Sequence, residues 1–214
     1  HEADISEQVE QNITVVGLVF DAYTSEKREN KFSTFASMQN INRDSYYGAN
    51  QDPDAYGTTH DFTSNVGTQF SYSFDKALFA PSKFLVGIDN TTGILYDEKL
   101  GANGNPNTTI ADQSINTLGA YIQNEWNFSF MKVLLGIRND LYSIKNYVVE
   151  NIDEISGNVI SPRINFLFDL RENLQYRLSY SSGFRTPQIF DEDLHIEASA
   201  ARRVIHENDP NLIQ

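Results

Sequence analysis

The chain has 214 residues, of which 40% are hydrophobic and 12% aromatic, with 14 Phe and 11 Tyr. This length suits one sizeable domain, and the aromatic content favours strands, because such side chains suit a pleated surface. The net charge of -13 argues against nucleic acid as a partner, since phosphates need a basic surface. The absence of cysteine excludes disulfides, thiolate metal sites and cysteine nucleophiles.

Alternation of apolar and polar residues predicts about eight strands along the chain. In the clearest segment, residues 62–74, most even-numbered positions are apolar and all odd-numbered ones are polar or glycine. Successive side chains of a strand point to opposite faces, so this segment has one apolar and one polar face. The expected strands cover residues 13–23, 32–42, 62–74, 84–90, 117–128, 133–141, 163–169 and 174–181. Most are about ten residues long, which is about what a tilted strand needs to cross a bilayer.

Every charged residue of the five clearest strands falls on the polar face. A Lys or Arg that faces lipid near the bilayer midplane costs roughly 2–4 kcal/mol, so a membrane would enforce this sorting. A soluble barrel or sandwich would sort its charges in the same way, with the apolar face inside. Alternation alone therefore leaves both classes open.

The connections between the expected strands alternate between short and long. The short ones are 24–30, 75–82, 129–132 and 169–173, and the long ones are 43–61, 91–116, 143–161 and the segment after Tyr180. In an up-and-down barrel this order places short turns at one rim and long loops at the other, as in outer-membrane barrels. The sequence therefore predicts an all-β, antiparallel up-and-down meander that forms a partial transmembrane β-barrel. We expect residues 1–214 to be one partial barrel domain.

Four motifs resemble the TonB-dependent receptor family. A Tyr-x-Gln-x-Glu strand, residues 121–125, precedes a Gly-x-Arg-x-Asp strand, residues 136–140. A strand that opens with Ser-Pro-Arg, residues 161–163, precedes one that ends in Gly-Phe-Arg-x-Pro, residues 183–187. The stretch 190–195 is similar to a loop of some family members, so the resemblance covers about residues 119–195.

The resemblance implies a receptor of the Gram-negative outer membrane that imports a scarce nutrient and is not an enzyme. Its ligand would be an iron chelate, cobalamin or an oligosaccharide, and it would need no cofactor. Its other partners would be outer-membrane lipid and the TonB energy-transducing system, acting through a plug region. The chain shows no plug-like segment, and family barrels close with about 22 strands. We therefore expect a fragment that lacks the plug and the closing strands.

Several residues are candidates for the functional surface. The expected lumen-facing residues are Glu125, Arg138, Asp140, Arg163 and Arg177. For each arginine the favoured alternative is a structural pair with a neighbouring carboxylate that steadies the wall. Tyr46, Tyr47 and Tyr56 on an expected loop offer rings that could stack on a ligand, although exposed loop tyrosines are common.

No motif in the chain supports catalysis, and the support for a metal site is weak. Asp191, Asp193 and His195 belong to the densest group of ligand-type residues, but their spacing matches no known calcium loop. We expect a solvated acidic loop there and no metal. There is no Gly-x-Ser-x-Gly elbow and no phosphate-binding glycine-rich loop. The alternatives to a receptor are a soluble secreted β-sandwich for binding or adhesion, and a passive porin or barrel enzyme.

Overall fold

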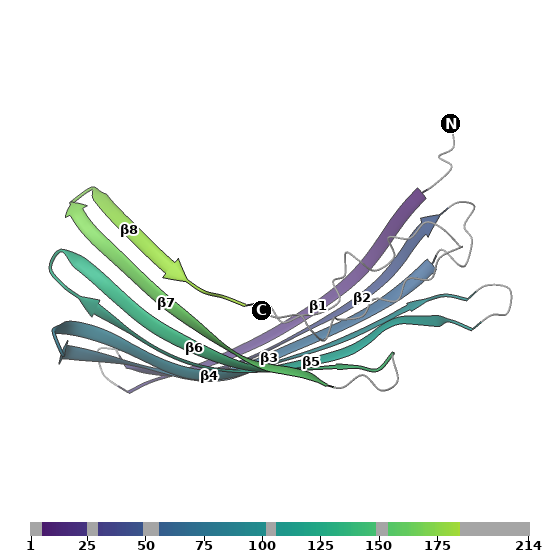
Figure 1. The fold of residues 1–214 in the computed structure, drawn as a ribbon, viewed down its shortest axis with the longest axis horizontal. Helices are drawn as coiled ribbons and strands as arrows, with labels where there is room; N and C mark the ends of the chain where they lie inside the picture. The colour runs from purple at the N-terminus through teal and green to yellow at the C-terminus, as the bar shows by residue number, and fades with distance from the viewer. Residues whose placement is uncertain (1–5, 25–29, 49–55, 102–105, 149–153, 185–214) are drawn as a thin grey trace.

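The computed structural model describes residues 6–24, 30–48, 56–101, 106–148 and 154–184. These residues form one sheet of eight antiparallel strands that lie side by side in chain order (Figure 1). The strands are β1 (Ser6–Tyr23), β2 (Lys31–Gly48), β3 (Tyr56–Ala77), β4 (Ala80–Lys99), β5 (Thr108–Asn127), β6 (Met131–Asn146), β7 (Ile155–Arg171) and β8 (Leu174–Ser181). The all-β antiparallel meander is therefore confirmed.

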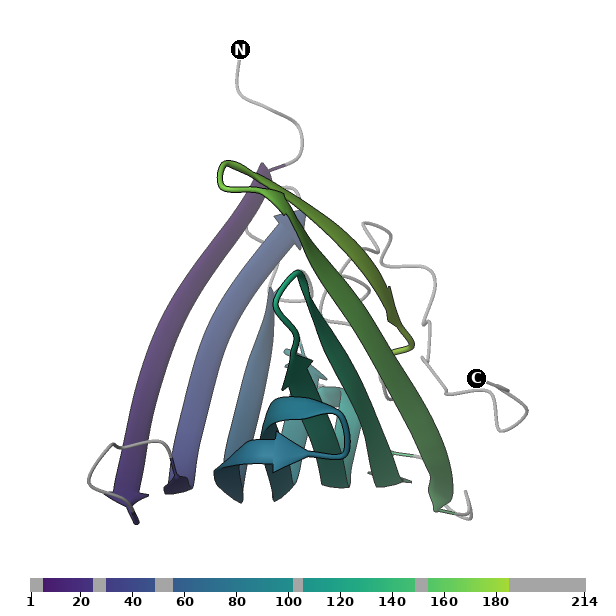
Figure 2. The same ribbon diagram turned by 90° about the vertical axis from the view of Figure 1, so that its left-hand side faces the viewer.

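The sheet is a single curved wall, with β1 at one side and β7 and β8 at the other (Figures 1 and 2). Within the described residues, β1 pairs only with β2, and β8 pairs only with β7, so the sheet is not closed. Its described part contains no second layer of strands, which is what the soluble sandwich would require. No helix long and apolar enough to cross a membrane occurs among these residues.

The strands are much longer than the sequence pattern predicts. β1 to β7 have 16 to 22 residues each. Segments 43–48, 56–61, 91–99, 108–116, 143–146 and 155–161, expected as loops, continue the strands. Polar residues occupy both faces in much of these segments, which hides the alternation. Backbone hydrogen bonds between neighbours nevertheless extend the ladder, because they do not depend on which side chains the strand carries.

The longer strands also change the connections. Those from β3 onward alternate as expected, with links 78–79, 100–107, 128–130, 147–154 and 172–173. The first two links, 24–30 and 49–55, are equal in length, so the expected contrast between them is wrong. The C-terminal ends of β1, β3, β5 and β7 lie at one end of the sheet, called here the turn end (Figure 1). The opposite end is called the loop end.

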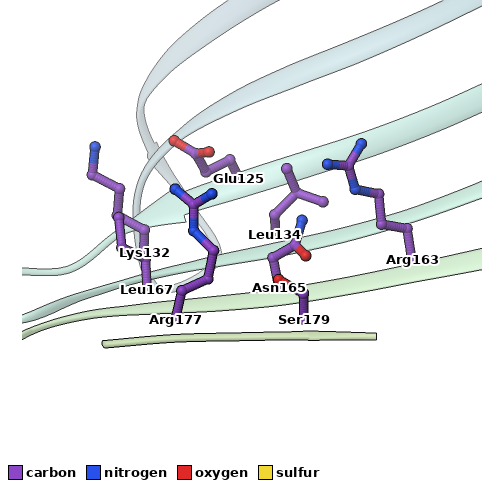
Figure 3. A pocket seen from close by; sticks show the side chains of 8 residues that line it. All are labelled: Glu125, Lys132, Leu134, Arg163, Asn165, Leu167, Arg177 and Ser179. Atoms are coloured by element: carbon purple, nitrogen blue, oxygen red, sulfur yellow. The ribbon is translucent and has the colours of Figure 1, made fainter. Parts of the chain in front are cut away.

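The register of the ladder assigns every side chain to one of two faces. Residues paired across neighbouring strands share a face, so one row of pairs contains Phe32, Phe70, Val86, Ile122 and Ile137. The next row toward the turn end on the opposite face begins with Lys31 and Ser71. The face of this second row also includes Lys132 and Arg177, whose side chains rise from the inside of the curved sheet (Figure 3). The second row therefore lies on the concave face, and the first on the convex, outer face.

The outer face is apolar in its turn-end half. Aromatic side chains gather nearest the turns: Phe32, Phe70, Tyr72, Phe74, Phe84, Trp126, Phe166, Phe168 and Tyr176. The rings of Tyr72 and Phe74 meet edge to face, with their centroids 4.7 Å apart. The Trp126 indole Nε1 donates a hydrogen bond to the Ala77 carbonyl at 3.0 Å. Aliphatic side chains, including Ile88, Ile122 and Ile137, follow toward the loop end and are 44–48% exposed.

An asparagine belt limits the apolar region on the loop side. Its members on the outer face are Asn40, Asn90, Asn116, Asn139 and Asn158. The Asn90 and Asn116 amides exchange hydrogen bonds at 3.0 and 3.2 Å, and the Asn139 amide donates to Asn158. The outer-face stretches Leu118–Trp126, in which Asn124 is the polar exception, and Ile160–Phe168 are about nine residues long, close to the ~9–11 that a tilted strand needs to cross a bilayer.

The turn between β3 and β4 holds a strained residue. Leu78 has φ of 63°, and the Phe79 amide donates to the Ala77 carbonyl at 2.8 Å, so Leu78 is the centre of a γ-turn. This conformation is unfavourable for a residue with a β-carbon, by roughly 1–2 kcal/mol. Leu78 is 77% exposed and thus gains little from packing in return.

We predict that Leu78→Gly stabilises the protein by up to about 1 kcal/mol, because glycine removes the steric strain but raises the entropy of the unfolded chain. Phe79→Gly is the matched control, since Phe79 is also exposed and its φ is negative. That variant should be destabilised. Urea unfolding of both variants measures the change, and equal effects at the two positions would contradict strain at Leu78.

Candidate functional site

The concave face carries all five residues expected to face a lumen. Arg138 pairs with Tyr121, and Arg163 pairs with Gly136, two residues before Arg138. Asp140 lies two residues after Arg138 in β6, and Glu125 lies four residues after Tyr121 in β5. Arg177 of β8 pairs with Leu167 of β7, and Leu167 lies four residues after Arg163 in the same strand. Side chains two apart in a strand share a face, so the five lie on one surface.

Arg138 lies at the centre of this surface and binds two carboxylates. Its terminal nitrogens donate to both oxygens of Asp89 at 2.7 and 2.8 Å, across the intervening strand β5. Its Nε donates to Asp140 at 2.8 Å. Asp140 is 5% exposed, whereas the Arg138 side chain keeps 35% of its surface exposed. Arg138 therefore forms the expected wall-steadying pair, which ties β4 to β6.

Glycines make room for this network. A β-carbon on Gly119 would lie 1.9 Å from Arg138 Nη2, and one on Gly87 would lie 2.4 Å from the Tyr121 ring. Tyr121 thus lies flat across Gly87 and donates to Gln69 Oε1 at 3.0 Å, two strands away. The Arg138 guanidinium lies 5.6 Å from the centre of the same ring. Strands β3 to β6 are thereby joined by side chains on their concave face.

The Gly-Phe-Arg motif has a visible structural role in its described part. Phe184 packs on Tyr142 of β6, with ring centroids 5.3 Å apart. Tyr142 in turn lies over Gly157 of β7, where a β-carbon would be 2.5 Å from its hydroxyl oxygen. Arg185 and the rest of the motif lie outside the described residues.

The turn-end part of the concave face contains two adjoining hollows that share Glu125. The first, of about 230 Å³, is lined by Glu125, Lys132, Leu134, Arg163, Asn165, Leu167, Arg177 and Ser179 (Figure 3). The second, of about 400 Å³, includes Lys31, Lys83 and Glu125 among its lining residues. Lys31 is paired with Asp21 at 3.3 Å, and Ser33 donates to the same carboxylate at 2.6 Å.

Arg163 and Arg177 differ from Arg138. Within the described residues neither forms an ion pair with a carboxylate, so the favoured expectation of a wall-steadying pair is wrong for both. The reason is their position: the paired neighbours of Arg163 are Gly136 and Ser181, and that of Arg177 is Leu167. Arg163 Nε can donate to the Asn165 amide oxygen at 3.1 Å, once that amide is oriented to satisfy its neighbours.

The tyrosines predicted on a loop lie in strands. Tyr46 of β2 pairs directly with Tyr56 of β3, and their ring centroids are 4.6 Å apart. Both belong to the outer face, and Tyr46 is only 5% exposed. Tyr47 is also within β2. The expectation that these three tyrosines lie on a loop is therefore wrong.

The weak metal candidates Asp191, Asp193 and His195 lie outside the described residues. Among the described residues, no group of three or more His, Asp or Glu side chains is placed to hold a metal ion.

Comparison with known proteins assigns the chain to a family. The family model described as TonB dependent receptor-like, beta-barrel, matches residues 9–210. The chain belongs to this family. TonB-dependent receptors are outer-membrane transporters of Gram-negative bacteria and not enzymes, which confirms the expectation that the chain is not an enzyme. No curated protein matches the sequence.

Solved TonB-dependent receptors share the fold. The ferric citrate transporter FecA is 13% identical with a TM-score of 0.62, and the match covers 79% of this chain and 27% of FecA. The alcaligin receptor FauA from Bordetella pertussis is 10% identical, with a TM-score of 0.62 and coverage of 82% and 29%. The siderophore receptor PiuA from Acinetobacter baumannii is 11% identical, with a TM-score of 0.64 and coverage of 81% and 32%. The chain thus spans about a third or less of these receptors.

Several residues of the site were not among the sequence candidates. Asp89 and Gln69, with Tyr121 of the Tyr-x-Gln-x-Glu motif, complete the Arg138 network, and Lys83 and Lys132 add to the turn-end charge. The alternation of side chains along each strand could have placed each of them on the concave face. It could not have predicted which residues they contact, because contacts across two strands depend on the register and on the glycines between.

We predict that Asp89→Asn destabilises the receptor by about 1–2 kcal/mol, because an amide has one acceptor oxygen in place of two and turns its NH2 group toward a guanidinium N–H. The loss should stay below the ~3–5 kcal/mol of a fully buried pair, since solvent reaches Arg138 and Asp140 remains bound. Urea unfolding measures it. Glu154→Gln removes the acid of an exposed pair with Lys145 and should leave stability unchanged. An unchanged Asp89→Asn variant would show that the network does not brace the wall.

Proposed function

We propose that the chain is a part of the barrel wall of an outer-membrane receptor, with its outer face in lipid and its concave face toward the lumen. The observation that carries this proposal is the zoning of the outer face. An apolar band of about bilayer depth, aromatic nearest the turns and aliphatic beyond them, is limited on the loop side by the asparagine belt. Such an exposed apolar face would be an aggregation hazard in water, whereas lipid covers it without loss.

The remainder of the barrel is proposed to come from other parts of the receptor. The described sheet has two open edges, which are sites of uncontrolled association unless further strands pair with them. The matched region covers only 27–32% of the solved relatives, which are thus more than three times as long. We infer that residues 1–214 form one partial barrel domain of a longer receptor. Its plug region would contact the TonB energy-transducing system and would lie outside this chain.

For the transported nutrient we propose an iron chelate. The proteins that share the fold are described as receptors or transporters for ferric citrate, alcaligin and siderophores. At 10–13% identity the likeness to these proteins shows a shared fold and does not by itself identify the ligand. Cobalamin and an oligosaccharide therefore remain the competing ligands. The exposed basic groups of the concave face, described below, suit an anionic chelate better than a neutral sugar.

Uptake by cells tests the transport proposal. A deletion strain lacking the receptor gene and the same strain carrying the gene would be given ⁵⁵Fe-citrate, ⁵⁵Fe-siderophore, labelled cyanocobalamin or a labelled maltodextrin. We expect only an iron chelate to enter in a receptor-dependent way, and the uptake should vanish when TonB is removed. Uptake of cobalamin or sugar would assign a different ligand. Independence from TonB would contradict the receptor proposal.

Two adjacent residues of β5 test the lipid-facing assignment. Ile122 is on the outer face in the middle of the apolar band, and Gln123 is on the concave face. We predict that Ile122→Arg lowers the unfolding free energy of the receptor in phosphatidylcholine vesicles by about 2–4 kcal/mol. Gln123→Arg introduces the same side chain on the wet face and should have a much smaller effect. Equal losses would show that the two faces do not have different surroundings.

A further inference from the structure

The first hollow of the concave face holds three cations with no ionic partner among the described residues. Lys132, Arg163 and Arg177 line it together with one acid, Glu125 (Figure 3). Elsewhere on this face, Arg138 and Lys31 are bound to aspartates at 2.7 and 3.3 Å. The wall therefore pairs Arg138 and Lys31, which brace it. It leaves these three cations exposed, and among the described residues Lys83 of the second hollow also forms no ion pair.

The register shows how the cations are arranged. Lys132 of β6, Leu167 of β7 and Arg177 of β8 form one row of pairs across the strands. Lys132 and Arg177 are thus two strands apart, roughly 10 Å at the backbone. Arg163 lies two rows nearer the loop end on β7, four residues before Leu167. Long flexible side chains from these positions can converge on one small group between them, and Figure 3 shows them rising from the same side of the sheet.

The charge balance is unusual for this chain. The whole sequence has 29 acidic and 16 basic residues, yet the two adjoining hollows are lined by five basic residues and one acid. Like charges held close on one wall repel each other, so the cluster weakens the sheet unless an anion neutralises it. A feature that stabilises the wall would have included acidic neighbours, as Arg138 does.

We propose that Lys132, Arg163 and Arg177 form a binding site for carboxylate groups in the barrel lumen. The inference rests on the proposed function, because it takes the concave face to be the lumen. Two arginine forks match the planar, two-oxygen geometry of a carboxylate, and the lysine adds a point charge. Leu134 and Leu167 lie among them and reduce local hydration. Glu125 in the same hollow lowers the positive potential, which disfavours a dianionic phosphate relative to a carboxylate.

The carboxylate can come from two sources. One is a carboxylate-bearing ligand that passes through the lumen, and the other is an Asp or Glu side chain of a protein segment that packs inside the barrel. Both place the same group against the same three cations. The two sources differ in whether the carboxylate is covalently part of the receptor, which a cross-linking experiment detects.

The reactivity of the Lys132 amine in the full-length receptor tests the site. A carbodiimide joins a lysine to a carboxylate in contact with it, and peptide mapping identifies the partner. A cross-link from Lys132 to an Asp or Glu of the receptor assigns a protein source. No such cross-link, together with protection of Lys132 from amine labelling by citrate and not by inorganic phosphate, assigns a ligand source. A Lys132 that labels freely in every condition overturns the proposal, as does equal protection by phosphate.

Variants separate the site from general charge effects. The double variant Arg163→Gln/Arg177→Gln should reduce the cross-link or the citrate protection at Lys132 by about ten-fold, as expected for loss of charge-assisted contacts. Arg171→Gln, which removes an arginine of β7 that does not line the hollow, is the matched control and should change neither. An unaffected double variant would also overturn the site. Labelling of Lys132 does not depend on transport. A receptor that takes up ⁵⁵Fe normally but whose Lys132 labels freely would therefore refute the carboxylate site and leave the proposed transport function intact.

Discussion

The backbone ladder is the interaction on which the rest of this structure depends. Eight strands satisfy their amide and carbonyl groups only by pairing with their neighbours, so the ladder fixes the register across the whole wall. Because side chains alternate along each strand, that register assigns every residue to one face, and a slip by one residue would exchange the faces. Arg138, for example, reaches Asp89 and Asp140 only because β4, β5 and β6 keep their present alignment. The separation of an apolar outer face from a polar concave face is therefore a property of the register.

This constraint also explains how much could be predicted from the sequence. Where one face is apolar and the other polar, as in residues 62–74 and 118–128, the alternation identifies the strand and its orientation. Toward the loop end the outer face becomes polar, as at Asn116 and Asn158, and no contrast remains to mark the strand. The ladder continues there through backbone bonds, so the loop-end parts of β2 to β7 were expected as loops. The γ-turn at Leu78 left no sequence signal, because leucine is a poor residue for a positive φ.

The candidate site divides in the same way. The alternation along the strands predicts one common face for Glu125, Arg138, Asp140, Arg163 and Arg177. The register of the sheet places all five on the concave face. The partners of the arginines could not be predicted from this alternation, since they depend on which residues lie two strands away. Arg138 finds Asp89 because Gly119 leaves the path open, whereas Arg177 is paired with Leu167 and finds no acid. Two arginines with the same position in the alternation thus have different roles.

The concave face is organised along the strand direction as a result. Its middle is neutralised and cross-linked by Arg138, Tyr121 and their partners, which gives the wall stiffness across four strands. Its turn end keeps a surplus of positive charge that the wall does not neutralise by itself. Stiffness in the middle allows this imbalance, because the repulsion at the turn end acts on strands already held by the network and by the ladder. A wall built in this way can keep unpaired charge on its concave face without losing its register.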